Sequence, residues 1–341
     1  MKVHTVPVSE SVGLHLSHDV TQVDVVNGFK GARFCRGHQI RKEDVPILRS
    51  MGREELAVLL LEEGEVHEDD ASLRLARCLQ GSGLMLEGPS EGKCSLFATH
   101  RGLLSFDEEV VHAINEDTDW VLATLPPNIS VEKGERVASF RIAPLIVKED
   151  QVARVEKLAT PVSVLPFRPY SVALVTTGRE IAEGLVQDAF EPQLRKKIQF
   201  YGASFAGHSV VGDSKDEITK AVRSFLAEET SIIICTGGMS IDVEDRTPEA
   251  IVNIADDVIF RGIPVLPGSN LMLARTNESY IIGAPACVVA CHHTSLDLIL
   301  DRLFAGVVPT QKEIRRWGVG GLCRSCTTCF YPVCSFASRM H

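Results

Sequence analysis

The second half of the chain alternates between short apolar runs rich in β-branched residues and amphipathic stretches with helical spacing. Strands are predicted at 172–175, 205–211, 232–235, 258–260 and 280–282, and helices at 191–201, 215–228, 248–254 and 288–304. Strands that alternate with helices in this way pair in parallel and are covered by helices on both faces. The pattern therefore predicts a three-layer α/β domain with a mostly parallel sheet over residues 165–308.

The regions on either side of this domain lack the alternation. Residues 1–164 are predicted to form an α+β region rich in short strands, with a helix at 71–79 that follows acidic residues 68–70. Two prolines within Leu165–Tyr170 predict a linker. The pattern ends after Gly306, and residues 309–341 are predicted to form a Cys-rich tail.

Composition narrows the function classes. The chain has 45 acidic and 35 basic side chains, a net charge of −10, and no long basic run, which argues against broad nucleic-acid binding. The apolar run at 280–291 is too short to span a membrane, and the amino terminus has no apolar signal core. These features predict a cytoplasmic protein whose ten Cys residues are thiols or metal ligands.

Two of the predicted strands end abruptly in Thr and Gly. These ends are Thr176-Thr-Gly178 and Thr236-Gly-Gly238. Parallel strands present backbone N–H groups at their carboxyl edge, where phosphate-bearing small molecules bind. We therefore expect a phosphate site made by Thr176, Thr177, Gly178, Thr236, Gly237, Gly238 and Ser240. The alternative is a pair of tight turns with ordinary helix caps.

Acidic residues follow both strand ends. Glu180 and Asp188 come after the first, and Asp242, Glu244 and Asp245 after the second. Carboxylates beside a phosphate suit a hard cation such as Mg²⁺ between them. Alternatively, Asp245 caps the helix predicted to begin at residue 248. Two further loops, with Pro267-Gly268 and with Pro285, are candidates to line the same pocket, although a Pro-Gly pair often makes only a turn.

This ordered set of motifs resembles the molybdopterin-binding domain. That domain occurs in molybdopterin molybdenumtransferases, molybdopterin adenylyltransferases and the competence-damage-inducible protein family, and the resemblance covers roughly residues 171–305. Ser11–Val20 and Val131–Val137 are similar, more weakly, to the amino-terminal region of the molybdenumtransferases. The two-part layout favours the molybdenumtransferase branch.

The resemblance implies a reaction. Adenylylated molybdopterin would lie across the two Gly-rich ends, molybdate would be inserted between its dithiolene sulfurs, and Mg²⁺ would assist the release of AMP. Asp245, Glu180 and Asp188 would be the catalytic acids. Asp242, Pro267, Gly268 and Pro285 would join the Thr, Gly and Ser residues named above in binding the cofactor. A molybdoenzyme or another cofactor-biosynthesis protein would be the partner, and the family leads us to expect a homodimer.

The chain also departs from the family pattern. Arg179 stands where molybdenumtransferases usually have Asp, and Ala286-Cys287 replaces their Gly-Asn. Phe29–His38 occupies roughly the place of their Ser-Ala-Met-Asp-Gly-Tyr signature. These departures favour, as an alternative, a non-catalytic carrier or sensor that delivers cofactor to a molybdoenzyme. A hydrolase of pyridine nucleotides or ADP-ribose is a third interpretation, against which the domain order argues.

The tail contains four cysteines within twelve residues, Cys323, Cys326, Cys329 and Cys334. Four thiolates suffice to ligate one metal centre, and the tight spacing predicts an iron–sulfur cluster or Zn²⁺. Redox-active or free thiols are the alternative.

Other polar clusters have weaker signals. A phosphate or molybdate subsite, or else a solvated basic face, is predicted for Arg33, Arg36, His38, Arg41 and Lys42. The run from His67 to Asp70 is a cation site or, more simply, an acidic helix start. His292 and His293 are predicted to pack inside an apolar helix. Isolated, mostly buried thiols are predicted for Cys35, Cys78, Cys94, Cys235 and Cys291.

Overall fold

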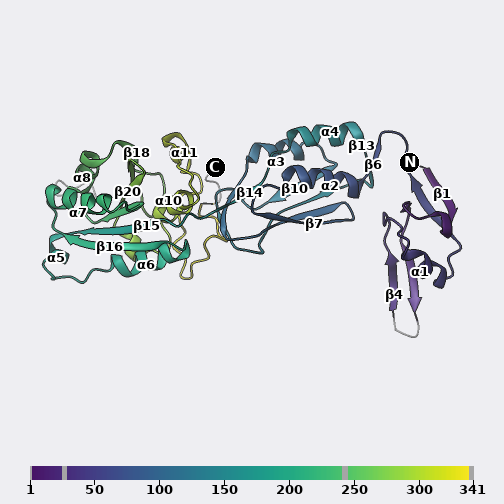
Figure 1. The fold of residues 1–341 in the computed structure, drawn as a ribbon, viewed down its shortest axis with the longest axis horizontal. Helices are drawn as coiled ribbons and strands as arrows, with labels where there is room; N and C mark the ends of the chain where they lie inside the picture. The colour runs from purple at the N-terminus through teal and green to yellow at the C-terminus, as the bar shows by residue number, and fades with distance from the viewer. Residues whose placement is uncertain (1, 25–28, 240–244, 338–341) are drawn as a thin grey trace. The chain divides into compact units, whose positions relative to one another are not determined.

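The computed structural model describes residues 2–24, 29–239 and 245–337. The chain forms two compact units, and Figure 1 shows the elements of both. Unit 1 comprises Met1–Thr99, Phe106–Leu125 and Gly134–Ser163, and unit 2 comprises His100–Ser105, Pro126–Lys133 and Val164–His341. Two short segments from the first half of the chain therefore belong to the second unit.

Unit 1 has the α+β organisation predicted from its sequence. Its strands are β1 (Lys2–Pro7), β2 (His15–Leu16), β3 (Val20–Asp24), β4 (Phe29–Phe34), β5 (Glu55–Leu60), β6 (Glu65–His67), β7 (Leu84–Ser90), β8 (Lys93–Ala98), β10 (Trp120–Thr124), β12 (Arg136–Ile142) and β13 (Ile146–Lys148). Its helices are η1 (Val8–Glu10), α1 (Asp44–Ser50), α2 (Glu68–Leu79), α3 (Glu108–Asn115) and α4 (Glu149–Leu158).

The sheets of unit 1 are small. They have the orders β1-β5-β2, β3-β4, β6-β13 and β10-β12-β8-β7, and every pairing within them is antiparallel. Helix α2 packs on β7, β8 and β12. It begins three residues earlier than predicted, because the Nδ1 atom of His67 caps it by accepting a hydrogen bond from Asp69 N.

Unit 2 contains the predicted α/β domain. Its strands are β9 (Gly102–Ser105), β11 (Ser130–Val131), β14 (Ser163–Pro166), β15 (Ser171–Thr177), β16 (Ser204–Val211), β17 (Ile232–Thr236), β18 (Asp257–Arg261), β19 (Met272–Thr276) and β20 (Ser279–Ala284). Its helices are α5 (Arg179–Ala182), α6 (Phe190–Phe200), α7 (Lys215–Ala227), α8 (Thr247–Ile254), α9 (Cys287–Ala290), α10 (Ser295–Phe304) and α11 (Gln311–Arg316).

The main sheet of unit 2 has the order β16-β15-β17-β20-β19-β18. Strands β16, β15, β17 and β20 are parallel, and β19 is antiparallel to both of its neighbours. One face carries Leu174 and Ile234 into a core with α6 and α10, and the other carries Val175 and Ile233 into a core with α7 and α8. Figure 1 shows α6 and α7 on opposite sides of this sheet. The predicted three-layer, mostly parallel α/β fold is confirmed.

One local prediction was wrong, and another differs from the structure in part. The single helix predicted at 288–304 is divided into α9 and α10, because Thr294 and Asp297 form a capping box that starts a new helix. His292 and His293 therefore lie in the connection between two helices and not inside one. The stretch predicted as a linker begins in β14, which lies at the edge of the sheet β11-β9-β14.

The predicted burial of isolated thiols holds in part. Cys94 and Cys235 are buried and Cys78 and Cys291 are partly buried, but Cys35 is exposed. Burial raises the pKa of the Cys235 thiol to about 12.

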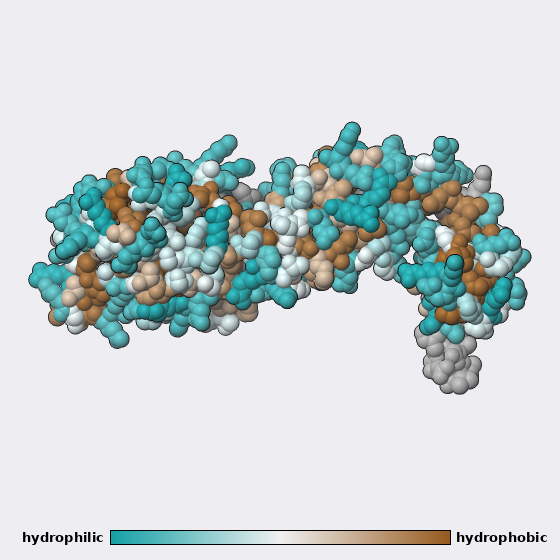
Figure 2. All heavy atoms as spheres, viewed as in Figure 1, coloured by the Kyte–Doolittle hydropathy of each residue, from teal (hydrophilic) through white to brown (hydrophobic). Residues whose placement is uncertain are grey.

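Figure 2 shows mainly hydrophilic residues on the face in view. Among the described residues, no helix is long and apolar enough to cross a membrane.

Candidate functional site

The Thr- and Gly-containing ends of the parallel strands lie side by side in unit 2. In the sheet register Thr176 pairs with Thr236, and Thr236 pairs with Ala284. The residues that follow, Gly178, Gly237 and Pro285, therefore start from the same carboxyl edge. This is the edge at which open α/β sheets bind ligands. The structure thus brings together the three strand ends that the sequence singled out.

A pair of threonines joins the first two strand ends on the α8 side of the sheet. Thr177 Oγ1 lies 3.3 Å from Thr247 Oγ1, which donates a hydrogen bond to Gly237 O at 2.9 Å. A Cβ atom on Gly237 would lie 2.2 Å from Thr177 O, and on Gly238 it would lie 2.8 Å from Thr247 Oγ1. Glycine is therefore required at 237 by the close approach of the two strand ends, and its positive φ of 87° adds to this requirement.

Asp245 stands directly before α8, beside this contact. Its Oδ2 atom is buried and has no hydrogen-bond partner among the described residues. An unsatisfied buried carboxylate oxygen costs stability unless a ligand or cation completes it. Ser240 and Asp242, the other candidates in this loop, lie outside the described residues. The buried Thr236 Oγ1 likewise has no partner in the described chain.

On the opposite side of the sheet, Thr176 meets Asp188. Thr176 Oγ1 donates to Asp188 Oδ2 at 3.1 Å and lies 3.0 Å from His208 Nε2. His208 Nε2 also lies 3.0 Å from Asp188 Oδ2, and its Nδ1 lies 3.3 Å from Glu191 Oε2. Asp188 Oδ1 accepts from Phe190 N at 2.7 Å at the start of α6. Both oxygens of Asp188 are therefore already engaged within the protein.

Sequence analysis did not identify His208 as a site residue. It lies on β16 opposite Leu174 of β15, and twenty residues separate it from Asp188 in the chain. A signal did exist, because a histidine interrupts an otherwise apolar and small-residue run. Only the register of β15 against β16 brings it to the carboxyl edge.

Gly178 gives the turn after β15 its backbone conformation, and its N–H group is already engaged in a hydrogen bond. Its φ is 142°, and its N–H donates to Val211 O at 3.2 Å. Glu180 is exposed on α5, and its carboxylate lies 3.6–3.7 Å from the position of a Cβ on Gly178. The Arg179 side chain is 79% exposed and pairs with Glu183 at 2.6 Å.

The end of β16 also carries an acid, which was not among the residues predicted from the sequence. Asp213 follows β16 and Gly212, and its Oδ2 accepts a hydrogen bond from Arg179 N at 3.0 Å. The signal for it was the same as at the other two edges, since a strand ends in glycine followed by an acid. Asp213 therefore belongs to the carboxyl edge.

The loop with Pro267 and Gly268 closes onto the start of α10. Ser295 Oγ donates to Gly268 O at 2.7 Å, and Ser295 N donates to Pro267 O at 3.1 Å. A Cβ on Gly268 would lie 2.2 Å from Ser295 Oγ. These contacts fix the shape of the loop, and no hydrogen bond among the described residues joins it to the Thr and Gly residues at the ends of β15 and β17. Binding of cofactor by Pro267 and Gly268 stays a prediction.

The α/β part of the chain is similar to a known protein family. Residues 173–305 match the family described as "Probable molybdopterin binding domain". The matched residues run from β15 through α10, which is the α/β part of unit 2. Residues 5–59 match a second family, described as a domain of unknown function.

Curated relatives match over part of their length. The chain is 25% identical over 172 residues to a molybdopterin molybdenumtransferase of Staphylococcus epidermidis, covering 48% of this chain and 38% of that protein. It is 25% identical over 176 residues to the enzyme of the same name from Staphylococcus aureus, covering 48% and 41%. The chain therefore spans less than half the length of these curated relatives.

Solved structures are also similar to part of this chain. The molybdopterin biosynthesis enzyme MoaB from Thermus thermophilus is 22% identical, with a TM-score of 0.36, covering 42% of this chain and 99% of that one. The molybdopterin biosynthesis Mog protein from Mycobacterium ulcerans is 22% identical, with a TM-score of 0.35, covering 39% and 94%.

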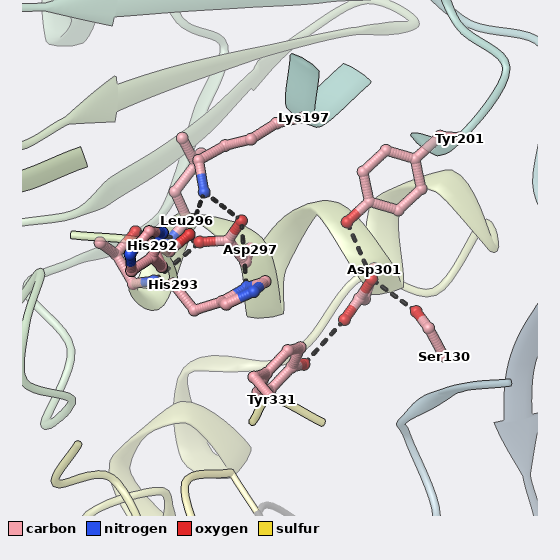
Figure 3. Close-up of polar contacts among 10 residues, drawn as sticks. Ser130, Lys197, Tyr201, His292, His293, Leu296, Asp297, Asp301 and Tyr331 are labelled. Atoms are coloured by element: carbon pink, nitrogen blue, oxygen red, sulfur yellow. Dashed lines mark hydrogen bonds and ion pairs between the residues drawn. The ribbon is translucent and has the colours of Figure 1, made fainter. Parts of the chain in front are cut away.

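The Cys-rich tail folds against the α/β domain of unit 2. Three hydroxyls converge on the carboxylate of Asp301 in α10: Ser130 Oγ at 2.6 Å, Tyr201 OH at 2.8 Å and Tyr331 OH at 3.1 Å (Figure 3). Burial raises the pKa of Asp301 despite these donors. Tyr331 thus ties the tail to α10, and Tyr201 ties α10 to α6.

The tail cysteines line one recess of about 190 Å³ together with Cys291, His292 and His293. The N–H of Ser325 donates to Cys323 Sγ at 3.5 Å, and Ser325 has a φ of 52°. Nevertheless, no three His, Cys, Asp or Glu side chains in the described part of the chain are arranged to hold a metal ion. The predicted ligands Cys323, Cys326, Cys329 and Cys334 thus share a recess without forming a preassembled centre.

Proposed function

We propose that this chain acts in molybdenum cofactor biosynthesis and binds adenylylated molybdopterin at the carboxyl edge of the main sheet. The observation that carries the proposal is the contact of Thr177 with Thr247 and Gly237, which joins the two Gly-rich strand ends into one surface. The missing side chains at 237 and 238 let the two strand ends approach each other, and the missing side chain at 178 leaves room for a phosphate at the first strand end. The family match over residues 173–305 supports pterin as the bound group.

Insertion of molybdate is the proposed reaction. The two dithiolene thiols would bond molybdenum, and one molybdate oxygen would leave with their two protons as water. A water molecule would then hydrolyse the pyrophosphate bond of the adenylylated substrate and release AMP. The buried, unpartnered Oδ2 of Asp245 fits a hard cation such as Mg²⁺, which would polarise the phosphate oxygens. In this arrangement the carboxylate of Asp245 would bind the cation. Thr177 and Thr247 would fix the two strand ends. Asp188, with Thr176 and His208, would order the start of α6.

An assay of product formation tests the proposal. Anaerobically purified protein is supplied with adenylylated molybdopterin, molybdate and Mg²⁺, and AMP release is followed together with activation of a cofactor-free molybdoenzyme. We expect multiple turnovers, and we expect Asp245→Ala to abolish them while the protein stays folded. Asp257→Asn is the matched control, because Asp257 is an exposed acid at the start of β18. Unchanged turnover in Asp245→Ala would remove Asp245 from the mechanism.

A carrier or sensor is the second candidate. Arg179 favours it, because an exposed guanidinium paired with Glu183 stands where the resembling transferases have a carboxylate. The same assay separates the two functions. Tight pterin binding with no AMP release identifies a carrier, and catalytic AMP release identifies a transferase.

Light scattering on the purified chain tests the expected homodimer.

We also propose that the tail binds a metal ion or an iron–sulfur cluster. Support comes from the shared recess and from the Ser325 N–H bond to Cys323 Sγ, which gives the turn between Cys323 and Cys326 the polarity that stabilises a thiolate. Metal analysis and absorption spectra of anaerobic protein test it. Cys326→Ser should lower the metal content, and Cys78→Ser, in unit 1, should not.

A further inference from the structure

Unit 1 contains a recess of about 700 Å³, and all of its lining residues belong to that unit. This volume lies within the range of sites that bind small molecules. Its walls come from residues that directly flank β3 and β4, from the start of α2, and from the segment 143–148 before and within β13. The recess belongs to the part of the chain outside the molybdopterin-binding domain.

Glu68 is the buried acid of this recess. It is the first residue of α2 and is only 7% exposed. Two glycines make room for its carboxylate: a Cβ on Gly92 would lie 2.7 Å from Glu68 Oε2, and a Cβ on Gly37 would lie 3.2 Å from Oε1. No side chain or backbone group in the described chain donates a hydrogen bond to this carboxylate.

An acid in this situation has opposite charges nearby but no hydrogen-bond donor among the described residues. Burial, helped by Asp69 and Glu91, raises the pKa of Glu68 to about 7, although the positive charges of Arg141 and Arg36 oppose this rise. Buried polar groups are nearly always hydrogen-bonded, and leaving one unpaired costs on the order of 1–3 kcal/mol. A ligand with N–H donors would supply what the protein does not.

Two guanidinium groups line the same recess. Both Arg36 and Arg141 act on Glu68 through their charge, but neither side chain makes a close ion pair or a hydrogen bond within the described residues. Lys148, by contrast, pairs with Glu65 at 3.1 Å. Guanidinium groups suit phosphate oxygens because their planar donors bind two oxygens at once. The recess therefore offers an acceptor for N–H donors and donors for an oxyanion.

We propose that this recess binds a phosphorylated heterocycle with an amidine edge, of the guanine or pterin type. Such an edge places two N–H groups in parallel, which matches the two oxygens of Glu68. The phosphate meets Arg36 and Arg141. A metal ion fits less well, since the described residues contain no group of three ligands placed for one.

Calorimetric titration of the full chain at pH 8 tests this site. The probes are GMP, neopterin phosphate, AMP and inorganic phosphate. Adenine offers one donor and one acceptor on the corresponding edge, so AMP cannot give Glu68 two N–H groups. We expect GMP or neopterin phosphate to bind at least tenfold more tightly than AMP. Whichever of GMP and neopterin phosphate binds more tightly shows whether the ligand is a guanine or a pterin compound.

Variants of the recess sharpen the test. Glu68→Gln keeps the shape of the side chain and should weaken the preferred ligand at least tenfold, while Arg141→Met should weaken every phosphate probe. Glu87→Gln, an exposed acid on β7, is the matched control and should change nothing. Equal affinity for all four probes, or no binding at all, would overturn the proposal.

A variant of the molybdopterin-binding domain separates this site from the proposed function. Asp245→Asn lies in unit 2 and should leave binding of GMP or neopterin phosphate unchanged. If Asp245→Asn abolishes that binding, the ligand occupies the carboxyl edge of the main sheet and the recess is not its site. Loss of AMP-releasing activity with intact binding in unit 1 would instead bear on the proposed function alone.

Discussion

The hydroxyl of Thr177 lies 3.3 Å from the hydroxyl of Thr247, and so the first Gly-rich strand end contacts the start of α8, just beyond the second. The two residues are seventy positions apart in the chain. Their contact, together with the bond from Thr247 to Gly237 O, holds the two loops at a fixed separation. A ligand that spans both loops therefore meets a surface that is already formed.

Gly237→Ala should destabilise unit 2 more than an ordinary glycine substitution. The added Cβ would lie 2.2 Å from Thr177 O, so one of the strand ends must move. We expect a loss of about 2–4 kcal/mol in the free energy of unfolding. Gly202→Ala is the matched control, because Gly202 also has a positive φ but has no atom within 4 Å of the added Cβ. Thermal unfolding of both variants measures the difference, and equal losses would contradict the steric argument.

Thr236→Val should leave stability unchanged or raise it. The Thr236 hydroxyl is buried with no partner in the described chain, and Val has nearly the same shape without a polar group to satisfy. Thr247→Val removes a hydroxyl that bonds Gly237 O and should cost about 1–2 kcal/mol. Denaturant titrations of both variants compare the two threonines. If Thr236 binds the ligand phosphate, pterin binding will weaken in Thr236→Val even though the fold does not.

Tyr331→Phe should loosen the Cys-rich tail. Tyr331 OH donates to the buried carboxylate of Asp301 at 3.1 Å, and removing this donor leaves Ser130 and Tyr201 to satisfy the acid. We expect faster reaction of the tail thiols with a disulfide reagent. Tyr170→Phe is the control, since the Tyr170 hydroxyl bonds only the Arg168 side chain among the described residues. Identical thiol reactivity in the two variants would show that Tyr331 does not anchor the tail.

Glu68 should make unit 1 less stable as the pH rises. Below about pH 4.5 the carboxyl is protonated in both the folded and the unfolded chain, and no penalty arises. Between pH 4.5 and 7 the unfolded chain loses the proton first, because the pKa in the folded chain is raised to about 7. The penalty therefore grows through this range and is complete above it.

Glu68→Gln removes this pH dependence. The variant should match the wild type at pH 4 and exceed its melting temperature by a few degrees, roughly, at pH 8. Glu87→Gln serves again as the exposed control. A constant difference between wild type and Glu68→Gln from pH 4 to pH 8 would show that the pKa of Glu68 is not raised.

The main sheet could be predicted from sequence because its signals are local. Each parallel strand is a run of β-branched residues, and each helix has its own amphipathic spacing. Strand β19 was missed because Met272–Thr276 has Met, Leu and Ala where a β-rich run is expected, and its pairing with β18 and β20 alone makes it a strand. The break between α9 and α10 was missed because Thr294 looks like any threonine until its contact with Asp297 is known.

The candidate site was predictable in its glycines and less so in its polar partners. The Thr and Gly residues stand at strand ends, and the parallel arrangement alone brings them to one edge. His208 reaches Asp188 only through the register of two strands, and Glu68 becomes a binding candidate only because Gly37 and Gly92 approach it from distant loops. Contacts of this kind depend on tertiary packing, which spacing in the sequence does not encode.

The interleaving of the two units has a consequence for how this protein can be divided. Strands β9 and β11, from the first half of the chain, share a sheet with β14, and Ser130 bonds Asp301 in α10. A gene fragment that begins at residue 164 would encode the family-matched segment but omit these pieces of its own fold. The second unit of this chain therefore cannot be exchanged as one continuous segment by a single recombination event.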